Sequence, residues 1–201
     1  MKKNLLLGVA AVLFFMSALP AWAAPFNMTL PDVPGPLNGG NVTYYVTSPG
    51  ASSSGGATLT FDLLGYLSVD GVNCCTDTFT LTVNGDLLFS GAFNMGGGGT
   101  NVVNFIDPGV TVISSTANGS FAGGLTKFSV AHTLLGGTNT YLFDYGVMQG
   151  LADEGWGLQS LDLSADVGAG GDQVPEPATM VLFGTGLAGL VGRRFRTRKN
   201  S

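Results

Sequence analysis

The residues best suited to chemistry in this 201-residue chain are Asp153, Glu154 and Trp156, within the sequence Asp-Glu-Gly-Trp-Gly. Neighbouring carboxylates offer the hard oxygen ligands that Ca²⁺ prefers, and an exposed indole ring can stack against a sugar. The alternative is that both carboxylates are solvated and that Trp156 fills the edge of a core. The pair is a poor glycosidase dyad, because neighbouring strand residues point to opposite faces and that reaction needs two carboxyl groups about 5 to 9.5 Å apart.

The same stretch resembles the last loop and strand of some extracellular carbohydrate-binding sandwiches. Those domains often have Asp-Asn where this chain has Gln159 and Ser160. The resemblance implies a carbohydrate-binding module, with Ca²⁺ as an optional cofactor. A carbohydrate-binding module is one of two alternatives to the main functional hypothesis given below.

The only two cysteines, Cys74 and Cys75, are adjacent. Neighbouring Cα atoms lie about 3.8 Å apart, below the usual separation of roughly 4.4 to 6.8 Å in disulfides. A vicinal disulfide is therefore strained, and the alternatives are free buried thiols or bonds to a second chain. A zinc site needs more soft ligands than these thiols and the single histidine, His132, supply.

An extracellular hydrolase is the second alternative function. No Gly-x-Ser-x-Gly nucleophile elbow occurs in the sequence, and the cysteines stand in no recognisable protease context. His132 has no evident catalytic partner, so we expect an ordinary strand residue. The sequence thus favours a protein that is not an enzyme.

The last part of the chain, residues 174–201, has three distinct segments. Pro175 and Pro177 surround Glu176 and favour an exposed, extended backbone. The uncharged apolar run at residues 178–192 would form a helix roughly 22 Å long, which spans a bilayer if the membrane thins locally and the flanking cations snorkel. A basic cluster follows, and the positive-inside rule predicts that it stays cytoplasmic: Arg193, Arg194, Arg196, Arg198 and Lys199.

Together these three segments resemble the PEP-CTERM sorting signal of Gram-negative bacteria, over residues 174–199. The resemblance implies processing at or near Val174, Pro175, Glu176 and Pro177 by an exosortase, a membrane-embedded cysteine protease-transpeptidase. It further implies a transient hold in the inner membrane and a final place at the cell surface or in an extracellular, biofilm-associated exopolysaccharide matrix. It implies no activity for the rest of the chain.

The N-terminus predicts export independently. Lys2 and Lys3 precede an apolar run, and Ala21-Trp22-Ala23 places small residues where a signal peptidase reads them, so we expect a cut between Ala23 and Ala24. A retained N-terminal anchor is the alternative, which the Ala-x-Ala pattern disfavours. Residues 24–173, called the exported region below, should therefore lie outside the inner membrane.

The exported region is strongly acidic. It holds twelve of the 13 acidic residues, between Asp32 and Asp172, and Lys127 is its single lysine or arginine, which gives a net charge of −11. Such a charge excludes binding to nucleic acid through phosphates. So many carboxylates can bind divalent cations or simply keep the region soluble.

The pattern of the exported region predicts strands. In Thr78–Val83 apolar residues alternate with threonines, and Asn84-Gly85 after it is a strong signal for a two-residue hairpin. About nine strands and no amphipathic helix indicate an all-β fold, an antiparallel, jelly-roll-like sandwich. We expect a signal peptide, a Pro/Gly-rich lead-in, the sandwich, a linker and the sorting signal with its transmembrane helix, at 1–23, 24–41, 42–167, 168–173 and 174–201.

Overall fold

The computed structural model describes residues 24–48 and 55–167. The predicted signal peptide, linker, sorting motif, transmembrane helix and basic tail lie outside the described residues. Among the described residues, no helix is long and apolar enough to cross a membrane.

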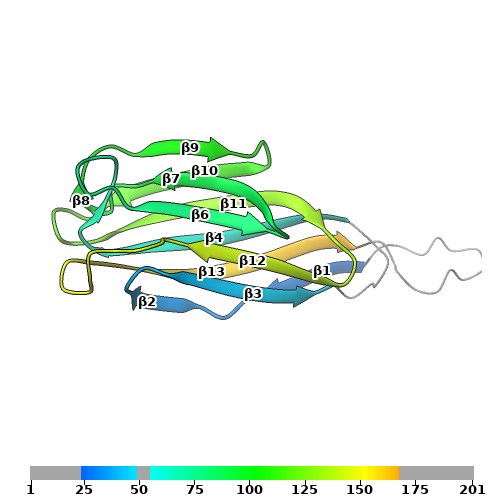
Figure 1. Cartoon of the computed structure of the whole chain (residues 1–201). Coiled ribbons are helices and arrows are strands. Elements are labelled where there is room, and N and C mark those ends of the chain that lie inside the picture. The colour runs from blue at the N-terminus through cyan, green and yellow to red at the C-terminus, as the bar shows by residue number, and fades with distance from the viewer. Residues whose placement is uncertain (1–23, 49–54, 168–201) are drawn as a thin grey trace, which may run out of the picture. The chain divides into compact units, whose positions relative to one another are not determined.

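Two antiparallel sheets form the described region, and the chain passes repeatedly from one to the other, as in jelly rolls (Figure 1). The first sheet has the order β1-β13-β4-β11-β10, and β2 also pairs with β13. Its strands are β1 (Ala24–Thr29), β2 (Val33–Leu37), β4 (Gly55–Leu67), β10 (Val110–Ala117), β11 (Gly124–Leu134) and β13 (Glu154–Val167). The prediction of an all-β antiparallel sandwich is confirmed.

The second sheet has the order β3-β12-β6-β7-β9. Its strands are β3 (Asn41–Thr47), β6 (Thr78–Val83), β7 (Asp86–Ala92), β9 (Val102–Ile106) and β12 (Thr138–Asp144). A small parallel pair, β5 (Val69–Asp70) and β8 (Gly96–Gly98), lies at the end of the sandwich where β6 and β13 begin (Figure 1).

Alternating apolar residues build the core between the two sheets. Phe61 of β4 stacks on Phe128 of β11 with ring centroids 4.8 Å apart, and it meets Phe143 of β12 edge-on at 5.1 Å. All three rings are buried. Aromatic side chains from both sheets therefore fill the interior, as the predicted period-two faces require.

The Asn84-Gly85 hairpin is confirmed. Both residues have positive φ, 54° and 91°, as a type I′ turn demands. Val83 and Asp86 on either side of the turn are paired, so β6 and β7 form an antiparallel hairpin.

Residues 24–48 and 55–167 form thirteen strands, whereas the sequence suggested about nine. Two of the additional strands, β1 and β2, lie in the segment predicted as a lead-in. Their prolines are tolerated because both strands lie at the margin of the first sheet, pairing with β13. Another, β8, lies in the glycine run at residues 96–99, where side chains at Gly96 and Gly97 would overlap the carbonyls of Leu67 and Ser68.

Candidate functional site

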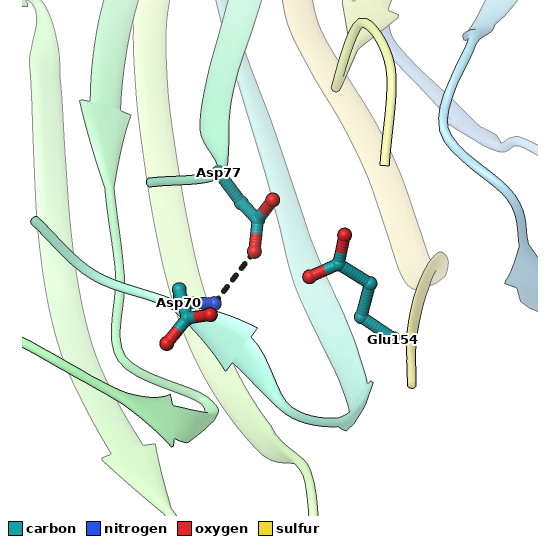
Figure 2. A group of neighbouring side chains, drawn as sticks. All are labelled: Asp70, Asp77 and Glu154. Carbon is teal, nitrogen blue, oxygen red and sulfur yellow. Dashed lines mark hydrogen bonds between the residues drawn. The ribbon is translucent and has the colours of Figure 1, made fainter. Parts of the chain in front are cut away.

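Three carboxylates meet at one end of the sandwich (Figure 2). Asp70 ends β5, Asp77 directly precedes β6, and Glu154 begins β13. An oxygen of each lies within 4.8 Å of an oxygen of each of the others. Their residues are only 8 %, 5 % and 0 % exposed, so water screens the repulsion between them poorly. Asp70, Asp77 and Glu154 are called the acidic cluster below.

The loops around the acidic cluster hold each carboxylate in place. The backbone N–H of Asp70 donates to Oδ2 of Asp77 at 2.7 Å, which closes the base of the loop at residues 71–76 (Figure 2). The side-chain amide of Asn73, in that loop, donates to Oδ1 of Asp70 at 2.7 Å. The backbone N–H of Gln149 donates to Oε1 of Glu154. An N–H group thus orients one oxygen of each carboxylate. Metal-binding carboxylates are commonly oriented by hydrogen bonds of this kind.

Two buried oxygens at this end of the sandwich have no hydrogen-bond partner among the described residues. They are Oε2 of Glu154 and the hydroxyl oxygen of Tyr145. Tyr145 follows β12, is 2 % exposed, and packs between Phe79 and Trp156 with ring centroids 5.4 and 5.5 Å away. Buried polar groups are normally satisfied, so each of these oxygens needs an explanation.

The charges of the acidic cluster act on its neighbours. Burial raises the pKa of Asp77 to about 7; the carboxyls of Glu154 and Asp70 add to this rise, and the N–H of Asp70 opposes it. Burial also raises the pKa of the Tyr145 hydroxyl, and the charges of Asp77 and Glu154 raise it further.

No cationic side chain of the exported region neutralises the acidic cluster. Lys127 is the one lysine or arginine there, and it pairs with Asp62 on the neighbouring strand, with Nζ 3.2 Å from Oδ1. Three acids in a buried position without a protein cation can hold protons or a metal ion. Carboxylate and hydroxyl oxygens are ligands for hard cations such as Ca²⁺ and Mg²⁺.

The structure separates the two carboxylates that the sequence placed in one site. Glu154 belongs to the acidic cluster, whereas Oδ1 of Asp153 accepts a hydrogen bond from the hydroxyl of Ser68 at 2.8 Å. Sequence reasoning missed Asp70 and Asp77. The available signal was that both lie at strand ends on either side of a short loop.

Trp156, the expected sugar-stacking residue, is completely buried. Its Nε1–H donates to the carbonyl of Gly39 at 3.0 Å. The indole therefore presents no face to solvent in this structure, and it packs in the core as the alternative expectation described. A role in sugar stacking has no geometric support here.

Cys74 and Cys75 are free, exposed thiols in the loop at residues 71–76. Their sulfur atoms are 2.9 Å apart, and the thiol of Cys74 raises the pKa of Cys75 through a hydrogen bond. The suggested alternative of buried thiols thus differs from the structure. Whether the pair forms a bond after export stays a prediction.

His132 lies on β11 as an ordinary strand residue. Its Nδ1 lies 3.2 Å from the carbonyl of Val130 and its Nε2 lies 2.9 Å from the hydroxyl of Tyr141. Since a carbonyl only accepts, Nδ1 carries the proton and Nε2 accepts from Tyr141. Burial lowers the pKa of His132, which agrees with this neutral tautomer.

Two shallow hollows of about 280 and 250 Å³ lie on the first sheet, over β1, β4 and β13. Both are lined by Asn27 and Ser164, and the larger one also by Asp162. Neither is lined by an aromatic side chain. They supply polar groups but no stacking platform for a sugar.

Comparisons with known proteins concern the C-terminal segment and the sandwich separately. The family model described as the PEP-CTERM protein-sorting motif matches residues 173–198. No curated protein matches the sequence. A similar solved structure is the native structure of a family 35 carbohydrate binding module from Clostridium thermocellum, with 14% identity over 69% of this chain and 86% of that chain. Its TM-score is 0.33, and at this level the likeness supports no inference about ligand or function.

The match at residues 173–198 covers the segment in which the sequence showed the Val-Pro-Glu-Pro motif, the apolar run and most of the basic cluster. The motif implies export, anchoring through the C-terminal segment and later processing by an exosortase. The suspected sorting signal is therefore confirmed: this chain is a protein that carries the PEP-CTERM sorting motif.

Proposed function

We propose that this protein is a non-enzymatic component of the cell surface or of the extracellular polysaccharide matrix, released from the inner membrane when its sorting motif is processed. The observation that carries the proposal is the match of the sorting motif to residues 173–198. The net charge of −11 over residues 24–173 favours a soluble, dispersed domain outside the cell.

The geometry of the described residues favours a structural role over catalysis. The acidic cluster is closed off from solvent, so a substrate cannot reach it. The neutral His132 is engaged by Val130 and Tyr141 and orients no nucleophile. Trp156 is buried and neither polar hollow is lined by an aromatic side chain, so neither supplies a sugar-stacking surface.

The test follows the protein from membrane to matrix in its native host. Cultures are separated into inner membrane, cell surface and matrix, and the C-terminus of the protein in each fraction is read by mass spectrometry. We expect chains that still end at Ser201 in the inner membrane and chains ending near Pro175-Glu176-Pro177 in the surface and matrix. A surface pool that still ends at Ser201 would contradict processing, and a protein confined to the inner membrane would contradict the proposed location.

A matched pair of variants sharpens this test. Glu176→Ala changes the acidic residue of the motif, whereas Asp172→Ala removes an acidic residue just before the matched segment. We expect the first variant to accumulate unprocessed in the membrane and the second to mature normally. Deletion of residues 193–199 should likewise impair retention or processing, because the basic cluster that stops transfer is lost.

A further inference from the structure

The acidic cluster is too costly to exist as three bare carboxylates. Like charges in a poorly solvated position disfavour ionisation of one another, and burial adds to that cost. Lys127, the single lysine or arginine of residues 24–173, is paired with Asp62 elsewhere on the sandwich. A counter-charge must therefore come from outside the described residues, or the cluster must hold protons.

Two buried oxygens, one within the acidic cluster and one outside it, point to a ligand. Oε2 of Glu154 is completely buried and has no partner among the described residues, and the hydroxyl of Tyr145 shares that condition. Tyr145 is not one of the three acids, and its ring packs between Phe79, two residues after Asp77, and Trp156, two residues after Glu154. A cation among these groups would satisfy both orphaned oxygens at once.

We propose that Asp70, Asp77 and Glu154, with the hydroxyl of Tyr145, bind one Ca²⁺ ion that joins the loop after β5 to the segment between β12 and β13. Two oxygens on opposite sides of a Ca²⁺ ion lie about 4.8 Å apart, at roughly 2.4 Å from the metal each, so the spacing of the cluster fits around one ion. The carboxylates supply three to six oxygens depending on their denticity, and Tyr145 supplies a neutral one.

Calcium suits the site better than the other common divalent ions. Mg²⁺ dehydrates reluctantly and keeps several waters, whereas these ligands are nearly inaccessible to solvent. Zn²⁺ prefers nitrogen and sulfur ligands, and the acidic cluster offers oxygen alone. Cys74 and Cys75 are exposed in the adjoining loop and are not among the clustered groups.

The ion would cross-link two loops. Asp70 and Asp77 stand at the two ends of the loop at residues 71–76, and Glu154 stands at the end of the segment that carries Tyr145 and Gln149. These loops are far apart in sequence. A bound ion would therefore stabilise the folded protein by mass action, in addition to the contacts of the core.

Binding is tested on the exported protein, recovered after processing and treated with a chelator. Terbium replaces calcium as a probe, because Tyr145 and the adjoining Trp156, 5.5 Å away, can transfer excitation energy to bound Tb³⁺. We expect Tb³⁺ emission on excitation of the aromatic residues, and its loss when Ca²⁺ is added. Calcium at about ten times its Kd should raise the Tm by roughly 3 to 6 °C for a domain of this size.

Variants identify the ligands. Asp77→Asn should weaken Ca²⁺ binding at least about tenfold, as expected when an outright ligand is lost. The control Asp86→Asn makes the same charge change at an exposed residue of the β6–β7 turn and should bind as the wild type does. If Asp77→Asn does not fold, Tyr145→Phe removes one oxygen, keeps all three acids, and should still weaken binding severalfold.

Several outcomes would overturn the proposal. Absence of both Tb³⁺ emission and a calcium-dependent rise in Tm would show that the acidic cluster holds protons. An unchanged affinity in both Asp77→Asn and Tyr145→Phe would place the ion elsewhere. An equal rise in Tm with Mg²⁺ would overturn the assignment to calcium.

Discussion

Replacing Trp156 by phenylalanine separates a structural role of this residue from a role in ligand binding. The indole is completely buried, and its N–H donates to the carbonyl of Gly39, itself a buried residue, at 3.0 Å. Losing this bond leaves the carbonyl unsatisfied, at a cost of about 1 to 3 kcal/mol. Removing the extra ring atoms adds a transfer and cavity cost of about 1 to 2 kcal/mol.

The free energy of unfolding should therefore fall by about 2 to 5 kcal/mol in Trp156→Phe, a large part of the total stability of an ordinary domain. Equilibrium urea unfolding measures the change. Tyr45→Phe is the matched control, because Tyr45 is an aromatic residue that is 73 % exposed on β3. Its unfolding free energy should change by less than about 0.5 kcal/mol.

A small effect would refute this reasoning. If Trp156→Phe lost less than about 1 kcal/mol, the ring could not be the buried, hydrogen-bonded element that the structure describes. If the indole were dispensable for stability, a role of Trp156 in binding a sugar at the surface would again be the better explanation. The measurement needs no knowledge of a ligand, so it decides the role of Trp156 before any glycan is screened.

Three further predictions concern buried or exposed polar groups. Asn139→Asp should cost about 3 kcal/mol or more, measured by urea unfolding, because the buried amide donates to two backbone carbonyls that a carboxylate would repel; exposed Asn38→Asp is the control. Burial lowers the pKa of His132 from its ordinary 6.5, so the unfolded chain binds a proton first and stability should fall as the pH drops below about 6.5, less so in His132→Gln. In protein recovered from outside the cell, we expect Cys74 and Cys75 to resist thiol alkylation until they are reduced; two free thiols there would contradict a vicinal disulfide.

The strands were predictable because their apolar faces are local properties of the sequence. Leu59, Phe61 and Leu63 alternate along β4 and are all buried, as the period-two pattern requires. The turn at Asn84-Gly85 was equally local, since both residues tolerate positive φ. The strands β1 and β2 were missed because their prolines argue against a strand unless it lies at the margin of a sheet, and sequence alone does not show which strands do.

The acidic cluster could not be predicted, because topology assembles it. Asp70 and Asp77 are brought to Glu154 by the pairing of β13 with β4, across a long interval of sequence. Asp153 and Glu154 were expected in one site because they are adjacent in the sequence. In the structure, Asp153 accepts a hydrogen bond from Ser68 and Glu154 accepts one from Gln149. Pairs of residues next to each other along an extended chain diverge, whereas residues at the same end of different strands converge.

The solitary lysine of residues 24–173 has a consequence for how this protein is detected. Trypsin cuts after lysine and arginine, so Lys127 is its one cleavage point between Ala24 and the segment matched by the sorting motif. In the folded protein that point lies within β11, which is hydrogen-bonded to β10 on one side and β4 on the other. Folded protein should therefore survive trypsin at this bond, and denatured protein should give two very long peptides. Proteomic surveys based on tryptic peptides will underestimate its abundance, while an enzyme that cuts at aspartate has eleven sites in the same interval.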